Sequence, residues 1–251
     1  GDRLHEEVAQ RTDLLAGYIK ETKAKGGTLI IPAFSLERTQ GMLLEINNLI
    51  ESGKIEPLPV FLDSPLAITV TEMYHKYPQY LKESVQAQIK SGDDVFDFEG
   101  LTFTKSLKDS NDIALEKGAK IIIAGSGMSH GGRIRNHEKR YLDDPLTTVL
   151  LVGYQAVGSL GRLLNDGATK VKIDEEEVKV KAKIARIRGY SGHADRDQLI
   201  DLVAKGGHKA EQIFVTMGEE RSSLFLTQRL RDYLSVNAVA PSENEEVEIH
   251  F

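Results

Sequence analysis

The segment 125–140, GSGMSHGGRIRNHEKR, combines four glycines with four Lys and Arg side chains. It lies between an apolar run and a polar helical pattern, where backbone N–H groups can turn toward an anion and a helix N-terminus adds partial positive charge. The spacing therefore predicts phosphate binding by Ser126, Gly127 and Arg133. The alternative is a tight strand-to-helix turn followed by a solvated helix. The segment is not a Walker A loop, because no Gly-Lys-Ser or Gly-Lys-Thr ends it.

A second segment, GYSGHAD at 189–195, delivers His193 and Asp195 on a loop of small residues. Histidine changes its charge near neutral pH, so a histidine that can approach a substrate suits proton transfer. We therefore predict a catalytic role for His193, with a structural histidine as the alternative. For Asp195 we favour the N-cap of the following helix.

Three further loops follow apolar runs and carry hydroxyl or guanidinium groups. PAFSLERTQ (32–40) contains Ser35 and Arg38, LDSPLA (62–67) contains Ser64, and GYQAVGSLGRLL (153–164) contains Arg162. In parallel α/β sheets, ligands bind beyond the carboxyl ends of the strands, so these loops and the Gly-rich segment that begins at residue 125 predict one shared site. The alternative for Ser35 and Ser64 is helix N-capping.

The elements that position these loops alternate between strands and helices. Short apolar strands separated by helices are typical of a parallel sheet covered on both faces, so residues 1–165 predict a doubly wound, Rossmann-like α/β layer. The run VKVKAK (178–183) alternates Val and Ala with Lys and predicts a half-exposed antiparallel strand. The strands expected in the first 165 residues are 28–32, 58–65, 101–104, 119–125 and 147–153.

The composition limits the metal chemistry and the partners. With no Cys and seven His, any metal site must use His, Asp and Glu. No run of 18 apolar residues occurs, so we expect a cytoplasmic protein with no membrane partner. The net charge of −6 argues against a general nucleic-acid coat but permits local basic patches. His130 and His137 could touch phosphate, whereas His5, His75, His208 and His250 are expected on the surface.

Taken together and in this order, the segments resemble the β-CASP branch of the metallo-β-lactamase superfamily, the RNA-processing nucleases. The resemblance spans almost the whole chain and rests on these stretches: GDRLH (1–5), IPAFSLERTQ (31–40), FLDSPLA (61–67), GSGMSHGGR (125–133), VGYQAVGSLGR (152–162), GYSGHAD (189–195) and VTMGEE (215–220).

The resemblance implies a domain organisation and a chemistry. Residues 1–188 would form the Rossmann-like β-CASP domain, and 189–251 would supply the C-terminal strands and helices of a metallo-β-lactamase αββα fold. The family clamps RNA over two zinc ions, and His193 matches the histidine thought to act on the leaving group or the scissile phosphate. Ser35, Arg38, Ser64, Ser126, Gly127, Arg133 and Arg162 would then hold RNA phosphates.

The sequence departs from the family pattern in two ways, and both concern the zinc ligands. The family's HxHxDH zinc cluster and the acidic partner of His193 lie upstream of the segment at which this chain begins. We therefore expect the missing N-terminal metallo-β-lactamase half to be a partner, and this chain to bind no zinc itself. Met217 stands where the family has a zinc-ligating histidine, and a thioether is a poor replacement for imidazole on zinc.

The leading hypothesis is therefore the RNA-binding and catalytic-support portion of a zinc-dependent ribonuclease, inactive as this chain alone. The alternative is a non-catalytic RNA- or phosphate-binding module. A homodimer is left open, and a phosphoester enzyme that uses the Rossmann-like layer alone is disfavoured because no carboxylate cluster supports it.

Overall fold

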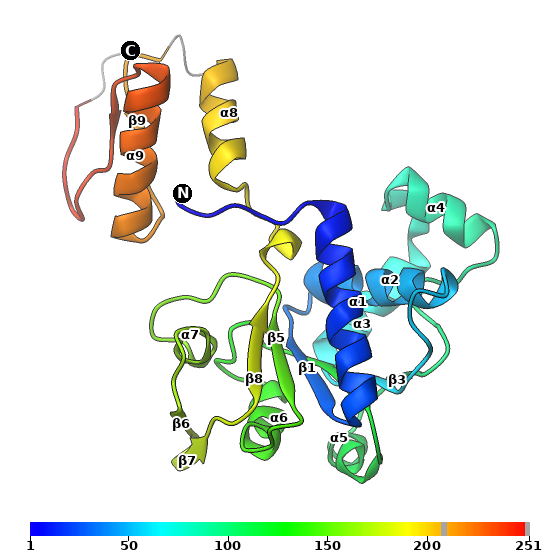
Figure 1. Ribbon diagram of the computed structural model, residues 1–251. Helices are drawn as coiled ribbons and strands as arrows, with labels where there is room; N and C mark the ends of the chain where they lie inside the picture. The colour runs from blue at the N-terminus through cyan, green and yellow to red at the C-terminus, as the bar shows by residue number, and fades with distance from the viewer. Residues whose placement is uncertain (207–209, 249–251) are drawn as a thin grey trace. The chain divides into compact units, whose positions relative to one another are not determined.

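The computed structural model describes residues 1–206 and 210–248, and the chain divides into two compact units (Figure 1). The large unit is Glu6–Tyr190, and the small unit joins Gly1–His5 to Ser191–Phe251. The predicted domain boundary after residue 188 stays a prediction.

The large unit is built on a six-stranded, wholly parallel sheet in the order β3-β2-β4-β1-β5-β8. This confirms the expected parallel α/β architecture. Its strands are β1 (Thr28–Pro32), β2 (Val60–Leu62), β3 (Leu101–Phe103), β4 (Lys120–Ala124), β5 (Thr148–Leu151) and β8 (Lys183–Arg186). The connecting elements are α1 (Val8–Lys25), α2 (Arg38–Glu51), α3 (Pro65–Lys76), η1 (Pro78–Tyr80), α4 (Glu83–Lys90), α5 (Leu107–Asp112), η2 (Ile113–Leu115), α6 (Ile134–Tyr141), α7 (Leu160–Asn165) and η3 (Arg188–Tyr190).

Helix α1 shows how local sequence sets these elements. Gly26 ends the helix at φ +64°, a left-handed conformation that favours glycine, and its N–H donates to the Lys23 carbonyl. The chain then enters β1, whose five residues are all buried. Gly26 is thus the C-cap of α1.

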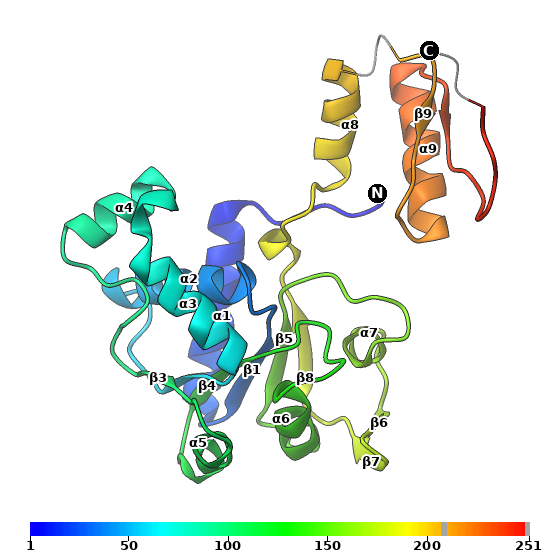
Figure 2. The same ribbon diagram turned by 180° about the vertical axis from the view of Figure 1, so that it is seen from behind.

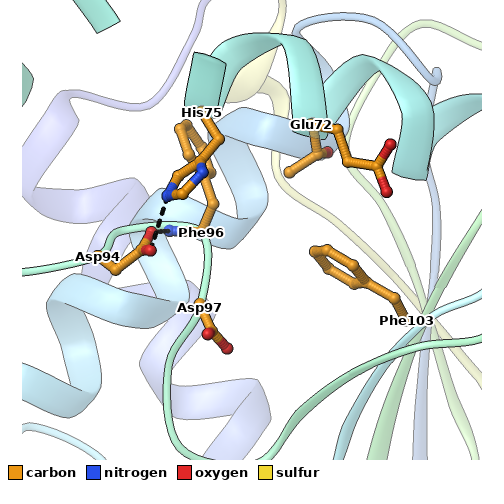
Figure 3. Close-up of a pocket in the computed structure, with 7 residues that line it drawn as sticks. Glu72, His75, Asp94, Phe96, Asp97 and Phe103 are labelled. Atoms are coloured by element: carbon orange, nitrogen blue, oxygen red, sulfur yellow. Dashed lines mark hydrogen bonds and ion pairs between the residues drawn. The ribbon is translucent and has the colours of Figure 1, made fainter.

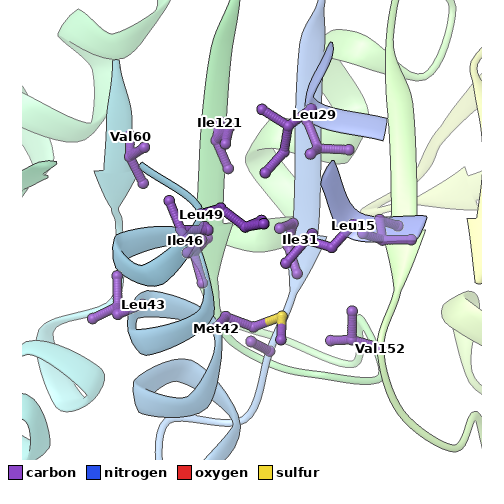
Figure 4. Close-up of a cluster of buried hydrophobic side chains, with 14 of the residues drawn as sticks. Leu15, Leu29, Ile31, Met42, Leu43, Ile46, Leu49, Val60, Ile121 and Val152 are labelled. Atoms are coloured by element: carbon purple, nitrogen blue, oxygen red, sulfur yellow. The ribbon is translucent and has the colours of Figure 1, made fainter. Parts of the chain in front are cut away.

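Apolar side chains leave the central strands on alternate sides and form a core on each face of the sheet. On one face, Leu29 and Ile31 pack with α1, α2 and α3 (Figure 4). On the other, Ile30 and Ile122 pack with α6 and α7. The helices that follow the adjacent strands β1 and β4 therefore lie on opposite faces, which makes the carboxyl ends of these strands a topological switch point (Figures 1 and 2).

The segment after residue 169 differs from its prediction. β6 (Lys170–Ile173) and β7 (Glu176–Lys179) form an antiparallel hairpin. Residues 180–182 belong to no strand, and β8 then pairs in parallel with β5. The single antiparallel strand expected over 178–183 is therefore wrong. The half-exposed alternation that suggested it arises partly in the hairpin and partly at the edge of the parallel sheet.

The small unit contains α8 (Arg196–Gly206), β9 (Ile213–Phe214), α9 (Glu220–Leu234) and β10 (Ala238–Val239). The two strands pair in parallel, and the N-terminal residues join this unit because the Arg196 N–H donates to the Arg3 carbonyl at 2.9 Å. Leu226, Leu230 and Ala238 are its only buried apolar residues within the described ranges, so its core is small.

No helix in the described part of the chain is both long enough and apolar enough to cross a bilayer.

Candidate nucleic-acid interface at the carboxyl edge of the sheet

Two serine hydroxyls meet at the switch point. Ser35 follows β1 and Ser64 follows β2, and their Oγ atoms are 3.4 Å apart. A Cβ placed on Gly125, directly after β4, would lie 3.5 Å from each hydroxyl, so the two groups converge over the Gly125 backbone. The parallel sheet thus brings together three of the loops expected to share a site.

The two serines differ in their local roles. Ser64 is the N-cap of α3 and accepts a hydrogen bond from the Ala67 N–H at 3.3 Å, which confirms the capping alternative for this residue. Ser35 does not cap α2, because the N-cap is Glu37, without a side-chain capping bond. The capping alternative is therefore wrong for Ser35, whose hydroxyl contacts only that of Ser64 among the described residues.

The Gly-rich turn after β4 uses many of its own amides. The Ser126 hydroxyl accepts hydrogen bonds from the N–H groups of His130 and Gly131 at 3.0 and 3.3 Å. The first N–H of α6, that of Ile134, donates to the Gly125 carbonyl at 3.1 Å. These N–H groups already have acceptors inside the turn and are not available to a phosphate. For this part of the segment, the structure therefore agrees with the alternative of a tight strand-to-helix turn. The Gly127 N–H has no acceptor in the described part of the chain.

A buried carboxylate below the turn organises the surrounding loops. Asp63, directly before Ser64, is fully buried and accepts hydrogen bonds from Thr104 Oγ1 (2.6 Å), Ser110 Oγ (2.6 Å), Arg133 Nη1 (2.7 Å) and His137 Nε2 (2.6 Å). Burial alone would raise the pKa of this carboxyl, but the hydrogen bonds, with His137 first among them, hold the pKa at about 2. Asp63 is therefore an ionised hub, and no pattern in the sequence singled it out.

Arg133 is committed to this hub. Beyond Asp63, its guanidinium donates to the carbonyls of Thr104 at 2.8 Å and Lys105 at 3.0 Å, and only 12% of the side chain is exposed. These contacts support a positioning role, in which Arg133 fixes the start of α6 to the loop after β3. His137 is buried on the same carboxylate, so it does not present its ring to an external phosphate.

The other arginines expected near the edge mostly have carboxylate partners. Arg135 pairs with Asp174 at 2.8 Å, and Arg162 pairs with Asp166 at 2.7 Å. Arg38, at the start of α2, is half-buried, and its guanidinium forms no ion pair or hydrogen bond with the described residues. Burial is the main cause that lowers the pKa of its guanidinium. The positive charge at this edge is therefore largely offset, with Arg38 as the exception.

The loop after β5 is fastened to the Gly-rich turn. Gln155 Nε2 donates to the Gly127 carbonyl at 3.0 Å, and the Gly161 N–H donates to the Met128 carbonyl at 3.3 Å. Ser159 is fully buried and caps α7 through the Arg162 N–H at 3.0 Å. These bonds hold Gly127 and Arg162 in one framework.

His193 lies in the small unit on an exposed loop. Its ring has no hydrogen-bond partner among the described residues, while its N–H donates to Ser191 Oγ at 3.2 Å. Asp195 caps α8: it accepts from the Gln198 N–H at 2.9 Å, and Gln198 Oε1 accepts from the Asp195 N–H. The interpretation of Asp195 as an N-cap is confirmed, and the His193 ring is free to engage another molecule.

The residues that the structure describes do not fit a zinc site. In residues 1–206 and 210–248, no group of three or more His, Asp and Glu side chains is placed to hold a metal ion. Met217 is fully exposed in a turn at φ +64°. His208 and His250 lie outside the described residues.

A cavity of about 300 Å³ lies where α3 meets the segment 94–97 and the end of β3 (Figure 3). His75 Nε2 contacts Asp94 Oδ2 at 2.7 Å there, and the lining also includes Glu72 and Asp97. Three carboxylates repel phosphate, so this cavity is not assigned to the interface.

Comparisons with known proteins relate both units to RNA enzymes. The Beta-Casp domain model matches residues 39–164, and a model described as a Zn-dependent metallo-hydrolase RNA specificity domain matches residues 177–241. The chain is 32% identical over 230 residues to Ribonuclease TTHA0252 of Thermus thermophilus, covering 92% of this chain and 52% of the relative.

Two archaeal relatives are similar to the same extent. An RNase J-like protein of Methanocaldococcus jannaschii is 31% identical over 223 residues, which cover 89% of this chain and 50% of the relative. Transcription termination factor FttA of Pyrococcus horikoshii is 31% identical over 250 residues, which cover 97% of this chain and 38% of the relative. The chain thus spans about half the length, or less, of the curated relatives it matches.

Proposed function

Because this chain belongs to the β-CASP family, we propose that it is the RNA-contacting and catalytic-support portion of a zinc-dependent ribonuclease, which hydrolyses phosphodiester bonds. The observation that carries the proposal is the pair of family matches, in which a β-CASP domain is followed by a domain described by its RNA specificity. The relatives named ribonuclease and RNase J-like protein support the same activity.

The carboxyl edge of the large unit would receive the RNA backbone. Ser35 and Ser64 offer hydroxyl donors, the Gly127 N–H is unused, and Arg38 offers a guanidinium without a carboxylate partner in the described chain. Such groups suit phosphate oxygens. Ser126, Arg133 and Arg162 would act mainly by holding the loops in place, because their polar groups already bond to the protein.

His193 would donate a proton to the oxygen that leaves when the phosphodiester bond breaks. Its exposed ring, without intramolecular hydrogen bonds in the described part of the chain, supports this role because the ring can meet a substrate atom directly. Asp195 would position His193 by capping α8, not by contact with the reacting atoms.

Zinc enters this proposal as a property of the family, whose second matched domain is described as Zn-dependent. Since the described residues offer no suitable cluster and Met217 stands at the expected ligand position, the zinc ligands would come from residues outside those that the structure describes. When bound, zinc would supply Lewis-acid activation of water and phosphate.

The test is RNA cleavage by the full-length gene product. His193→Ala should lower kcat by about 100-fold or more and leave RNA affinity unchanged, because it removes only the proton donor. His75→Ala, which removes another exposed histidine, is the matched control. Cleavage that is unchanged by His193→Ala would refute the assigned role.

The absence of a metal cluster in the described ranges also favours a second candidate, a non-catalytic RNA- or phosphate-binding module. Two measurements on the 251-residue chain, its zinc content and its RNA cleavage, test whether the chain alone is a complete enzyme, which neither candidate predicts. We expect RNA binding without tightly bound zinc and without cleavage. Stoichiometric zinc together with cleavage would overturn both the expectation and this second candidate.

A further inference from the structure

Phe34, between β1 and α2, is a supported but exposed aromatic ring. The residue keeps 45% of its surface exposed, although it directly precedes Ser35 at the carboxyl edge. A Cβ on Gly127 would lie 2.8 Å from Cδ2 and 3.0 Å from Cε2 of the ring, so the ring packs directly on the Gly127 backbone. Protein therefore supports part of the ring, and the remainder is available to another molecule.

The backbone that carries this ring is held in place. Both the N–H and the hydroxyl of Thr39 donate to the Phe34 carbonyl, at 3.1 and 2.8 Å. The buried Gln40 donates from Nε2 to the Ser35 carbonyl at 3.1 Å. A ring fixed before binding loses less conformational freedom when a ligand stacks on it.

Phe34 lies close to both a pair of hydroxyl groups and several exposed apolar side chains. Ser35 follows Phe34 directly in sequence, and its hydroxyl pair with Ser64 lies over the same Gly-rich turn. Several large side chains from the loops of this edge are also exposed: Leu36, Leu66, Tyr154 and Val157. A nucleotide presents the matching combination, because its base is flat and largely apolar on its faces, while its sugar and phosphate bind hydroxyl groups.

The charges at this edge favour contacts with bases over purely ionic contacts with the backbone. Arg133 and Arg162 are paired with carboxylates, which leaves Arg38 as the one edge arginine without such a pair in the described chain. Proteins that hold single strands combine backbone contacts with base stacking on aromatic rings. Where the ionic part is small, the stacking part must supply more of the affinity.

We propose that Phe34 is the stacking platform for one base of a single-stranded RNA, whose adjoining sugar and phosphate contact the Ser35–Ser64 pair. This inference rests on the proposed function and specifies that the bound RNA is single-stranded, since bases inside a duplex cannot expose a face to the ring. Gly127 is part of the platform because any larger residue there would displace the ring.

The experiment measures binding of the 251-residue chain to a labelled single strand of about ten nucleotides. Phe34→Ala and Phe34→Leu should weaken binding by about 5- to 150-fold, the range for loss of one stacked base. Phe34→Tyr should retain binding, because the ring remains. Tyr80→Ala, which removes a ring that is 83% exposed on η1, is the matched control and should have no effect.

Two further measurements separate stacking from charge. The loss caused by Phe34→Leu should be equal at about 50 and about 300 mM salt, whereas Arg38→Ala should reduce the salt slope by about 0.7. A single 2-aminopurine in the strand should change its fluorescence on binding to the wild-type chain and not on binding to Phe34→Leu. Polyphosphate with the same number of phosphates should compete poorly.

The outcomes distinguish a failure of the stacking platform from a failure of the proposed function. If the wild-type chain binds RNA and Phe34→Leu binds equally well, the stacking platform is refuted and the proposed function stands. Equal competition by polyphosphate also refutes the platform. If the wild-type chain binds no RNA, the proposed RNA-contacting role fails, and the platform fails with it.

Discussion

Glu138, on α6, is a buried carboxyl whose protonation should control the stability of the large unit. It is fully buried, and Ser129 Oγ donates to its Oε1, while Oε2 has no hydrogen-bond partner among the described residues. Arg135 interacts with it electrostatically but forms its ion pair with Asp174. Burial therefore dominates and raises the pKa of Glu138 to about 7, from an ordinary value of 4.5.

The sign of the effect follows from proton binding. Between pH 4.5 and about 7, the folded chain holds the Glu138 proton and the unfolded chain does not, so stability falls as the pH rises. Below pH 4.5 the two states are equally protonated, and above about 7 the full penalty applies. The raised pKa corresponds to about 3 kcal/mol, at 1.36 kcal/mol per pKa unit.

Glu138→Gln removes the titration and keeps an acceptor for Ser129. Urea unfolding followed by circular dichroism, from about pH 5 to about pH 9, gives the free energy of unfolding for each protein. The difference between variant and wild type should move by about 2.5 kcal/mol in favour of Gln across this range, because a small part of the penalty already applies at pH 5. Glu51→Gln, which removes an exposed carboxylate of α2, is the control. A difference for Glu138→Gln that does not change with pH would refute the assignment.

Three other perturbations test the structure. Asp63→Asn should cost about 3–5 kcal/mol in urea unfolding at neutral pH, because it leaves Arg133 without its buried partner. The wild type should also lose about 2 kcal/mol as the pH falls from 3.8 through about 2, since the pKa of Asp63 is lowered in the folded state; Asp63→Asn should not show this loss. Removal of divalent metal with EDTA should leave the melting temperature of the 251-residue chain unchanged, and a clear drop would reveal a metal site. Amide hydrogen exchange should be faster in α8 and α9 than in β1 and β4, because the small unit buries so few apolar residues in its described part; equal protection would contradict this.

The sequence predicts the sheet well where strands are buried on both faces. Continuous apolar runs identified β1, β4 and β5, because residues that face either core must be apolar. The edge strand β8 was missed as a member of the parallel sheet. Its residues Lys183–Arg186 are partly exposed, and such alternation is the same for a parallel edge strand and a two-stranded hairpin.

The loops of the site could be predicted, but the pairing of their charges mostly could not. The partners of Asp63 lie 41 to 74 residues away in sequence, so only the fold brings them to one carboxylate. The pair of Arg135 with Asp174 has a similar origin. The pair of Arg162 with Asp166 is different, because four residues on a helix place two side chains together, and this spacing was visible in the sequence.

The offset charges change what binding of RNA at this edge should require. A chain with a net charge of −6 repels a polyanion at long range, and most edge arginines here already have carboxylate partners. Added salt then has two opposed effects: it screens this repulsion, and it weakens the ionic contact at Arg38. Stacking on Phe34 and hydrogen bonds to Ser35 and Ser64 are much less sensitive to salt. RNA affinity should therefore depend on salt far less than it does for a protein whose arginines are unpaired, and more on whether the bases are free to leave a duplex.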